Sequence, residues 1–224
     1  MKRFLRDNSL GLVFGVLFLI ALVAQAFAGH AAFNQDQMTD GLDPISFGRY
    51  VTSASFGTDV AENWQSEYLQ FFLYIFLTVW LVQRGSPESK PVDEPGLESD
   101  EKQKIGRYAD EHSPAWARAR GIRLALYSNS LGIVMGLIFL GSWLAQSISG
   151  VAAYNERQLA DLQDPIGWGQ YIRAPDFWNR TLQNWQSELL AVASMAILAI
   201  YLRQRGSPQS KPVGTAHSAT GVEG

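Results

Sequence analysis

Hydrophobic residues in this chain are gathered into four runs that polar segments separate. The runs at 10–28 and 131–149 each extend about 19 residues without a charged side chain, roughly the length of helix that crosses a ~30 Å hydrocarbon layer. Two shorter runs, 68–82 and 189–202, reach a similar length if the string NWQSE before each one is the first turn of the helix. The pattern therefore predicts an all-α membrane protein with four transmembrane helices, at about 10–28, 64–82, 131–149 and 185–202.

The two halves of the chain repeat each other at an offset of 121 residues, since NWQSE occurs at 63–67 and again at 184–188. Residues 5–92 align with 126–213 without a gap and agree at about 40 of 88 positions, which is strong evidence for an internal duplication. The expected organisation is repeat 1 over 1–92 with an outer loop at 29–63, a charged cytoplasmic linker and interfacial segment over 93–124, repeat 2 over 125–213 with an outer loop at 150–184, and a disordered tail at 214–224.

The distribution of charge predicts the orientation of the spans. Lysines and arginines precede the first run, fill the linker and follow the fourth run, whereas the first outer loop has five acidic residues and Arg49 as its only Lys or Arg. Because basic residues are retained on the cytoplasmic side, we expect two parallel repeats with both termini cytoplasmic. Residues 1–28 also fit a cleaved signal peptide. We favour a retained helix because the run at 10–28 has an internal twin.

The first span of each repeat has matched positions at a heptad-like spacing, which is typical of a helix face that packs against another helix. Gly11 and Gly15 in repeat 1, and Gly132 and Gly136 in repeat 2, form the Gly-x-x-x-Gly pattern. That pattern lets helix backbones approach closely in lipid. The sequence therefore predicts that these four glycines form the packing seam between the repeats.

The matched string NWQSE allows two interpretations. As helix punctuation, Asn63 is an N-cap, Trp64 an interfacial anchor and Glu67 an anion in the first turn. As a polar site, Glu67 lies about as deep in its span as Gln25, so we hypothesise a Gln–Glu hydrogen bond in each repeat. Polar groups at membrane depth are costly and often mark function. The candidate polar site, with a structural or a cation- or proton-binding role, comprises Gln25, Gln65, Glu67, Gln146, Gln186 and Glu188.

Composition narrows the possible chemistry. The chain has no cysteine, which removes disulfides and thiolate chemistry. Its net charge of −3, with no basic patch interleaved with aromatics, does not favour a nucleic-acid partner. We find no catalytic motif, no metal-ligand constellation and no cofactor motif. Just before the third span, Trp116, Arg118, Arg120 and Arg123 predict an interfacial anchor to anionic lipid, with protein docking as the alternative.

Two motifs carry a resemblance to a known family. With ENWQSEYLQ leading into a span and RGSPESKP following it, the chain resembles an uncharacterised bacterial integral-membrane family known only as a domain of unknown function. The resemblance covers residues 1–92 and 125–213. It implies a multi-pass protein of the bacterial cytoplasmic (inner) membrane, and it brings no activity, cofactor or site residue with it.

The leading functional hypothesis is a non-enzymatic structural or partner-binding membrane component. Its expected partners are the lipid bilayer and either a second copy of the chain or another membrane protein. The alternative is a small cation- or proton-linked transporter or channel accessory that uses Glu67 and Glu188, and a membrane enzyme ranks third. Few polar residues lie in the middle of the predicted spans, which favours the structural or partner-binding hypothesis.

Overall fold

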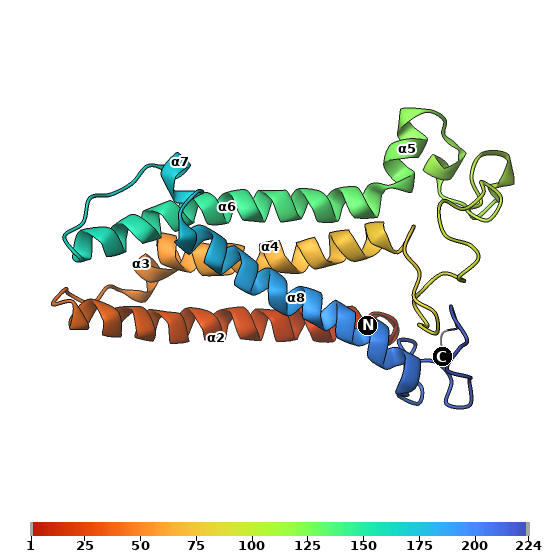
Figure 1. Cartoon of the computed structure of the whole chain (residues 1–224), viewed down its shortest axis with the longest axis horizontal. Helices are drawn as coiled ribbons and strands as arrows, with labels where there is room; N and C mark the ends of the chain where they lie inside the picture. Colours follow the sequence, from red (N-terminus) through yellow and green to blue (C-terminus); the bar gives the residue numbers. More distant parts are fainter. Residues whose placement is uncertain (1, 223–224) are drawn as a thin grey trace. The chain divides into compact units, whose positions relative to one another are not determined.

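The computed structural model describes residues 2–222, with the backbone alone for Lys2, and this part of the chain contains helices and no strand. Two helices are long and apolar enough to cross a membrane: α2 (Ser9–Thr39) and α6 (Ser130–Ala160), each of 31 residues (Figure 1). An all-α fold is therefore confirmed for the described residues. The chain divides into unit 1, the residues up to Ala61 with Ala145–Ala174, and unit 2, which is Glu62–Leu144 with the residues from Pro175 onward.

Shorter elements surround these helices. An asparagine separates α1 from α2 and another separates α5 from α6. The side-chain amide of Asn8 donates to the Phe4 carbonyl, and that of Asn129 to the Ala125 carbonyl, each at 2.8 Å. Such bonds to the carbonyl four residues earlier compete with the helical ladder. The remaining elements are α1 (Lys2–Asp7), α3 (Phe47–Val51), α4 (Ala54–Leu77), η1 (Gly106–Tyr108), η2 (Ala115–Arg118), α5 (Ile122–Ser128), α7 (Trp168–Tyr171) and α8 (Pro175–Tyr201).

The string NWQSE does not start a helix, so the interpretation of Asn63 as an N-cap is wrong. Helix α4 begins at Ala54 and α8 at Pro175, which places each string nine residues into its helix (63 − 54 and 184 − 175). Earlier start signals explain this. The Ser53 hydroxyl accepts the backbone N–H three residues later at 3.3 Å, as an N-cap does. Proline is favoured at the first position of a helix, because its missing N–H would have no partner there.

The segments expected as outer loops are largely helical. Helix α2 continues to Thr39 and α6 to Ala160, well past the predicted span ends at 28 and 149. Because the helices flanking the loops also start early, what remains between α2 and α3 is 40–46, and between α6 and α7 it is 161–167. The segments 29–63 and 150–184 thus contain much helix, and their placement outside the membrane stays a prediction. Hydropathy locates only the apolar part of a helix. Helices α2 and α6 continue beyond their apolar runs with polar residues, so hydropathy alone placed their ends too early.

In unit 1, each of these short loops is closed by one asparagine. Asn34 donates from Nδ2 to the Ile45 carbonyl at 3.0 Å and accepts the Ile45 N–H at 2.8 Å. Asn155 makes the same two bonds with Ile166, at 2.9 and 2.8 Å. We name these paired bonds the asparagine clamps. They satisfy backbone groups that the loops would otherwise leave without a partner.

In each half, a tyrosine packs against a glycine close to the asparagine clamp: Tyr50 against Gly29, and Tyr171 against Gly150. Tyr50 and Tyr171 are buried, and a Cβ added at Gly29 or Gly150 would come under 3.0 Å from the hydroxyl of its tyrosine. A side chain at either glycine would therefore displace the ring. The close approach explains why glycine occurs at both positions, and it joins α2 to α3 and α6 to α7 across the loops.

In unit 2, α4 ends at Leu77, five residues before the predicted end of its span at 82. Two β-branched residues follow, Thr78 and Val79, which lower helix propensity. The freed carbonyl of Val79 accepts the backbone N–H of Gly96 at 2.7 Å. Gly85 has a left-handed φ of +85°, as expected of a chain-reversing glycine, but it lies beyond a helix that has already ended.

The tail at 214–224, predicted to be disordered, makes defined contacts over its described part. The ammonium of Lys211 is buried, and it donates to backbone carbonyls of the tail and to the Gly85 carbonyl at 2.6 Å. The Thr220 hydroxyl in turn accepts the backbone N–H of Gly85 at 2.8 Å. A lysine needs such acceptors when it is buried, and the tail supplies three of them.

Helices α2 and α6 end in the same way but with different residues. The Leu42 N–H bonds to the Gln37 carbonyl at 2.8 Å, and the Gln163 N–H to the Gln158 carbonyl at 2.7 Å, the 6→1 bond of a Schellman ending. This ending requires a left-handed residue. The first helix uses Gly41 at φ +75°, whereas the second uses Leu162 at φ +58°.

We therefore predict opposite effects of exchanging these two residues. Leu162→Gly should raise the free energy of unfolding by up to about 1 kcal/mol, and Gly41→Leu should lower it by about as much. The left-handed conformation costs a side chain ~1–2 kcal/mol, partly offset by the flexibility of glycine in the unfolded chain. Both positions have open space, so strain alone is tested. Chemical denaturation of the purified protein measures it, and equal effects in one direction would contradict the strain argument.

Candidate functional site

An ion pair joins α4 to α8 beside the two NWQSE strings. Arg180 donates to both carboxylate oxygens of Glu62, from Nε at 2.8 Å and from its terminal nitrogen at 2.6 Å. The side chain of Glu62 is 8% exposed and that of Arg180 is 30% exposed. A two-bond contact between a guanidinium and a carboxylate is the strongest and most directional kind of ion pair in proteins. It fixes the two helices relative to each other.

The strings themselves meet one turn further along. The indole Nε1 of Trp185, in the second string, donates to Oε1 of Gln65, in the first, at 2.7 Å. Gln65 is completely buried, so its carbonyl oxygen would be costly without this donor. We name the set Glu62, Gln65, Arg180 and Trp185 the α4–α8 lock. Both strings therefore contribute to one helix-to-helix contact, rather than starting their helices.

An aromatic cluster lies next to the lock in unit 2, with Trp143 at its centre. The ring of Trp143 lies 5.6–6.2 Å, centroid to centroid, from four other aromatic rings. Aromatic pairs at such distances contribute stability beyond the area they bury. The cluster connects α6 to α8 in the same unit as the lock, and the four surrounding residues are Phe139, Phe177, Trp178 and Trp185.

The sequence interpretation missed Arg180, Phe177 and Trp178. A signal for them was present, because Phe177, Thr181 and Trp185 follow one another at intervals of four, the spacing of one helix face. Phe177 and Thr181 are indeed buried. Reading 177–185 as an amphipathic helix would have moved the start of α8 to Pro175 and placed Arg180 on it.

The two pairs of seam glycines differ in their surroundings. In unit 2, a Cβ at Gly136 would lie 3.2 Å from the ring of Phe72, and one at Gly132 would lie 4.0 Å from Ile75. The α6 glycines thus face α4. Within unit 1, nothing lies within 4 Å of a Cβ built at Gly11 or Gly15. The packing seam between the repeats stays a prediction.

The six candidate polar residues fall into different environments. Gln25 and Gln146 belong to unit 1, whereas Gln65, Glu67, Gln186 and Glu188 belong to unit 2. Gln65 and Gln146 are fully buried, and Glu67 and Gln186 are exposed. The hydrogen bonds hypothesised from Gln25 to Glu67 and from Gln146 to Glu188 therefore stay predictions. What the structure brings together is Gln65 and Trp185.

Across residues 2–222, no group of three or more His, Asp or Glu side chains is arranged to hold a metal ion. The carboxylate of Glu62 is already occupied by Arg180. The arrangement can therefore hold two helices together.

Comparison with known proteins gives one match. A family model described as a domain of unknown function (DUF6766) matches residues 1–222. The resemblance to such a family is thus confirmed, and it also extends across the linker. No curated protein and no solved structure matches the chain.

We predict that removing one partner of the Glu62–Arg180 ion pair lowers the free energy of unfolding more than replacing both partners with apolar residues. Arg180→Met should lower the free energy of unfolding by roughly 3 kcal/mol, because it leaves a buried carboxylate without its cation, and such losses run to ~3–5 kcal/mol. Glu62→Gln should cost less, because Arg180 is the more exposed partner. The double variant Glu62→Leu, Arg180→Leu should recover most of the loss.

Thermal or chemical unfolding of the purified variants measures this, with Arg173→Met as the control for removing an exposed arginine outside the lock. Additive losses in the double variant, with no coupling between positions 62 and 180, would contradict the assignment of the lock.

Proposed function

We propose that this chain, which belongs to the DUF6766 family, is a four-span protein of a bacterial cytoplasmic membrane, built from two parallel repeats with both termini cytoplasmic. The length and apolarity of α2 and α6 support the membrane location. The matching asparagine clamps support the repeats, because each half forms the same loop closure. The distribution of Lys and Arg supports the orientation.

Its proposed role is non-enzymatic: a structural or partner-binding membrane component. The α4–α8 lock carries this proposal. Gln65 and Trp185, one from each NWQSE string, bond to each other, and the Glu62–Arg180 pair that precedes the strings joins the same two helices. A transport site needs polar groups that exchange partners with a substrate or ion, whereas the Glu62 carboxylate and the Gln65 carbonyl oxygen are each held by a donor from α8. The lipid bilayer is the first partner, and a second copy or another membrane protein is the second.

A cation- or proton-linked transporter or channel accessory is the second candidate, and one observation favours it. Within the described residues, Glu67 on α4 and Glu188 on α8 form no ion pair, in contrast to Glu62. The negative charge of Glu188 also acts on Glu67 within unit 2. Two neighbouring carboxylates without a cationic partner are a reasonable place for a bound cation or proton.

The topology can be tested with single cysteines, since the natural chain has none. We predict that Gln163→Cys, in the second outer loop, reacts with a membrane-impermeant maleimide in intact spheroplasts. Leu97→Cys, in the linker, should react only after lysis. Both positions are exposed. Labelling of both cysteines, or of the linker alone, in intact cells would contradict the proposed orientation.

The two candidate functions differ in their response to ions. We predict that Glu67→Gln, Glu188→Gln changes the unfolding midpoint by the same amount at every cation concentration when the pH is held constant. The control Asp93→Asn, Glu101→Gln removes two exposed charges from the linker. If the carboxylates instead bind a cation, the wild type alone should gain stability with cation, by ~2.7 kcal/mol at a hundred times the dissociation constant. That result would favour the transporter.

A further inference from the structure

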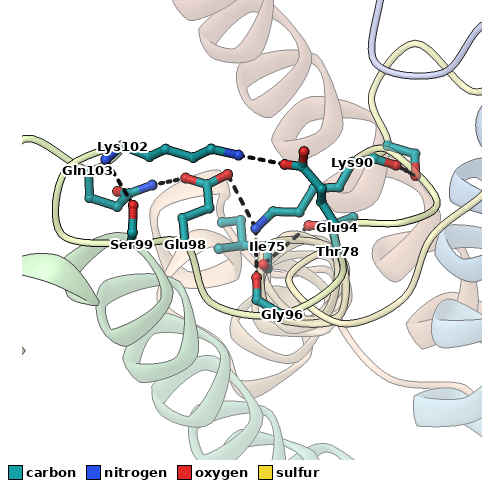
Figure 2. Close-up of polar contacts among 10 residues, drawn as sticks. Ile75, Thr78, Lys90, Glu94, Gly96, Glu98, Ser99, Lys102 and Gln103 are labelled. Carbon is teal, nitrogen blue, oxygen red and sulfur yellow. Dashed lines mark hydrogen bonds and ion pairs between the residues drawn. The ribbon is translucent and has the colours of Figure 1, made fainter.

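The lysines and the arginines of the cytoplasmic linker differ in how their charges are compensated. Lys90, just before the linker, and the linker lysines Lys102 and Lys104 each have an acidic partner, and two of these pairs are drawn in Figure 2. Lys90 lies 3.4 Å from a carboxylate oxygen of Glu98, Lys102 lies 2.5 Å from Glu94, and Lys104 lies 3.4 Å from Asp110.

Two of these acids, Glu98 and Asp110, are held in their ionised form by the groups around them. A hydrogen bond from Gln103, and then the charges of Lys90 and Lys102, lower the pKa of Glu98 below its usual value. Asp110 also has a lowered pKa, first through the backbone N–H of His112 and then through Lys104. Both carboxylates are therefore ionised at neutral pH, and their charges are balanced by the lysines beside them.

The arginines that follow have no such balance. Over residues 2–222, no ion pair involves Arg107, Arg118, Arg120 or Arg123. Arg107 donates to the Tyr108 hydroxyl at 2.6 Å, and Arg118 donates to the backbone carbonyl of Asp110. Both acceptors are neutral. No carboxylate of this part of the chain thus lies within ion-pair distance of these guanidinium groups, and guanidinium is the side-chain group best shaped to bind a phosphate by two hydrogen bonds.

Three of these arginines line one cavity of unit 2. It has a volume of about 660 Å³, within the ~300–1,000 Å³ typical of small-molecule sites, and Arg107, Arg118 and Arg120 share it with Tyr108, Asp100 and Glu101. Three cationic and two anionic groups leave a formal charge of +1. That charge matches a phosphodiester, which carries a single negative charge, better than it matches an anion with more charge.

Apolar side chains stand exposed beside this cavity. Trp116 is 52% exposed and lies against Tyr127, with ring centroids 6.2 Å apart, while Ile122 is 75% exposed. Only a few residues later the chain enters α6, the membrane-length helix. Exposed aromatic and aliphatic residues next to arginines are typical of the lipid–water interface.

We propose that this cavity binds the phosphodiester headgroup of an anionic phospholipid of the cytoplasmic leaflet, held by Arg107, Arg118 and Arg120. Trp116 and Ile122 enter the acyl-chain boundary beside it. The inference rests on the proposed membrane location and orientation. The interfacial anchor predicted from the sequence thus becomes a defined lipid-binding site, which attaches the linker to the lipid around α6.

Native mass spectrometry of the full chain in neutral detergent tests the site, with phosphatidylglycerol and phosphatidylcholine as probes. Arg118→Gln, Arg120→Gln should weaken the binding of phosphatidylglycerol about 25-fold, since a basic residue near an anionic surface contributes roughly fivefold. Lys102→Gln, Lys104→Gln removes the same charge from the same linker and should change binding by less than about twofold. Phosphatidylcholine should bind weakly to all forms.

Equal weakening in the arginine and lysine variants, or none in the arginine variant, would overturn the site. Displacement of the lipid by excess inorganic phosphate would overturn the lipid as the source of the phosphate. Arg120→Gln alone guards against local unfolding, because Arg120 makes no hydrogen bond within the described residues; it should weaken binding about fivefold. Carbonate extraction of the wild type separates the two proposals: a protein that stays in the membrane and shows no arginine dependence fails this inference alone.

Discussion

The buried carboxylate of Glu62 is the constraint on which the packing of unit 2 depends. Removing a charge from water is costly, and the cost is recovered only if a partner neutralises it with good geometry. Arg180 does so through two hydrogen bonds. Because both groups project from helices, their pairing fixes α4 and α8 in one register. The Gln65–Trp185 bond can then form one turn further along, and it adds a second point of attachment.

The aromatic cluster follows from this register. With Trp185 held by Gln65, its ring lies against Trp143 of α6, which in turn stacks on Phe139 and Phe177. The positions 121 residues before Trp143 and Trp178 hold Leu22 and Gly57. The two halves have therefore diverged at two of the five ring positions, whereas Phe139, Phe177 and Trp185 match Phe18, Phe56 and Trp64, and both halves keep the loop closures of unit 1. Each half keeps the residues that its own packing requires.

Hydropathy and repetition predicted most of the helices, because an apolar run and an amphipathic period are local properties of the sequence. They did not predict where α4 and α8 begin. Asn63 has the chemistry of an N-cap, but the helix already runs through it from a start that Ser53 caps. The lock was beyond local reasoning for another reason. Glu62 and Arg180 are 118 residues apart, and the repeat alignment pairs them with Gln183 and Asp59 rather than with each other.

Leu162 illustrates a second limit of sequence reasoning. Gly41, at the matching position of the first repeat, predicts a left-handed residue at the end of the helix. Leucine argues against this conformation, yet Leu162 adopts it. The linker shows the converse. The predicted contact of its arginines with lipid needed only composition, but the separation of paired lysines from arginines without an ion pair depends on which carboxylate each side chain reaches.

Cross-linking in native membranes tests most directly whether the two NWQSE strings face each other across α4 and α8. The pair Gln65→Cys, Trp185→Cys in this cysteine-free chain would be treated with a short bifunctional maleimide, after a protease site has been placed in the linker. The lock predicts that the two cleaved halves stay joined within one chain, whereas Glu67→Cys with Gln183→Cys gives little product. Halves that separate, or products that join only different chains, would contradict it.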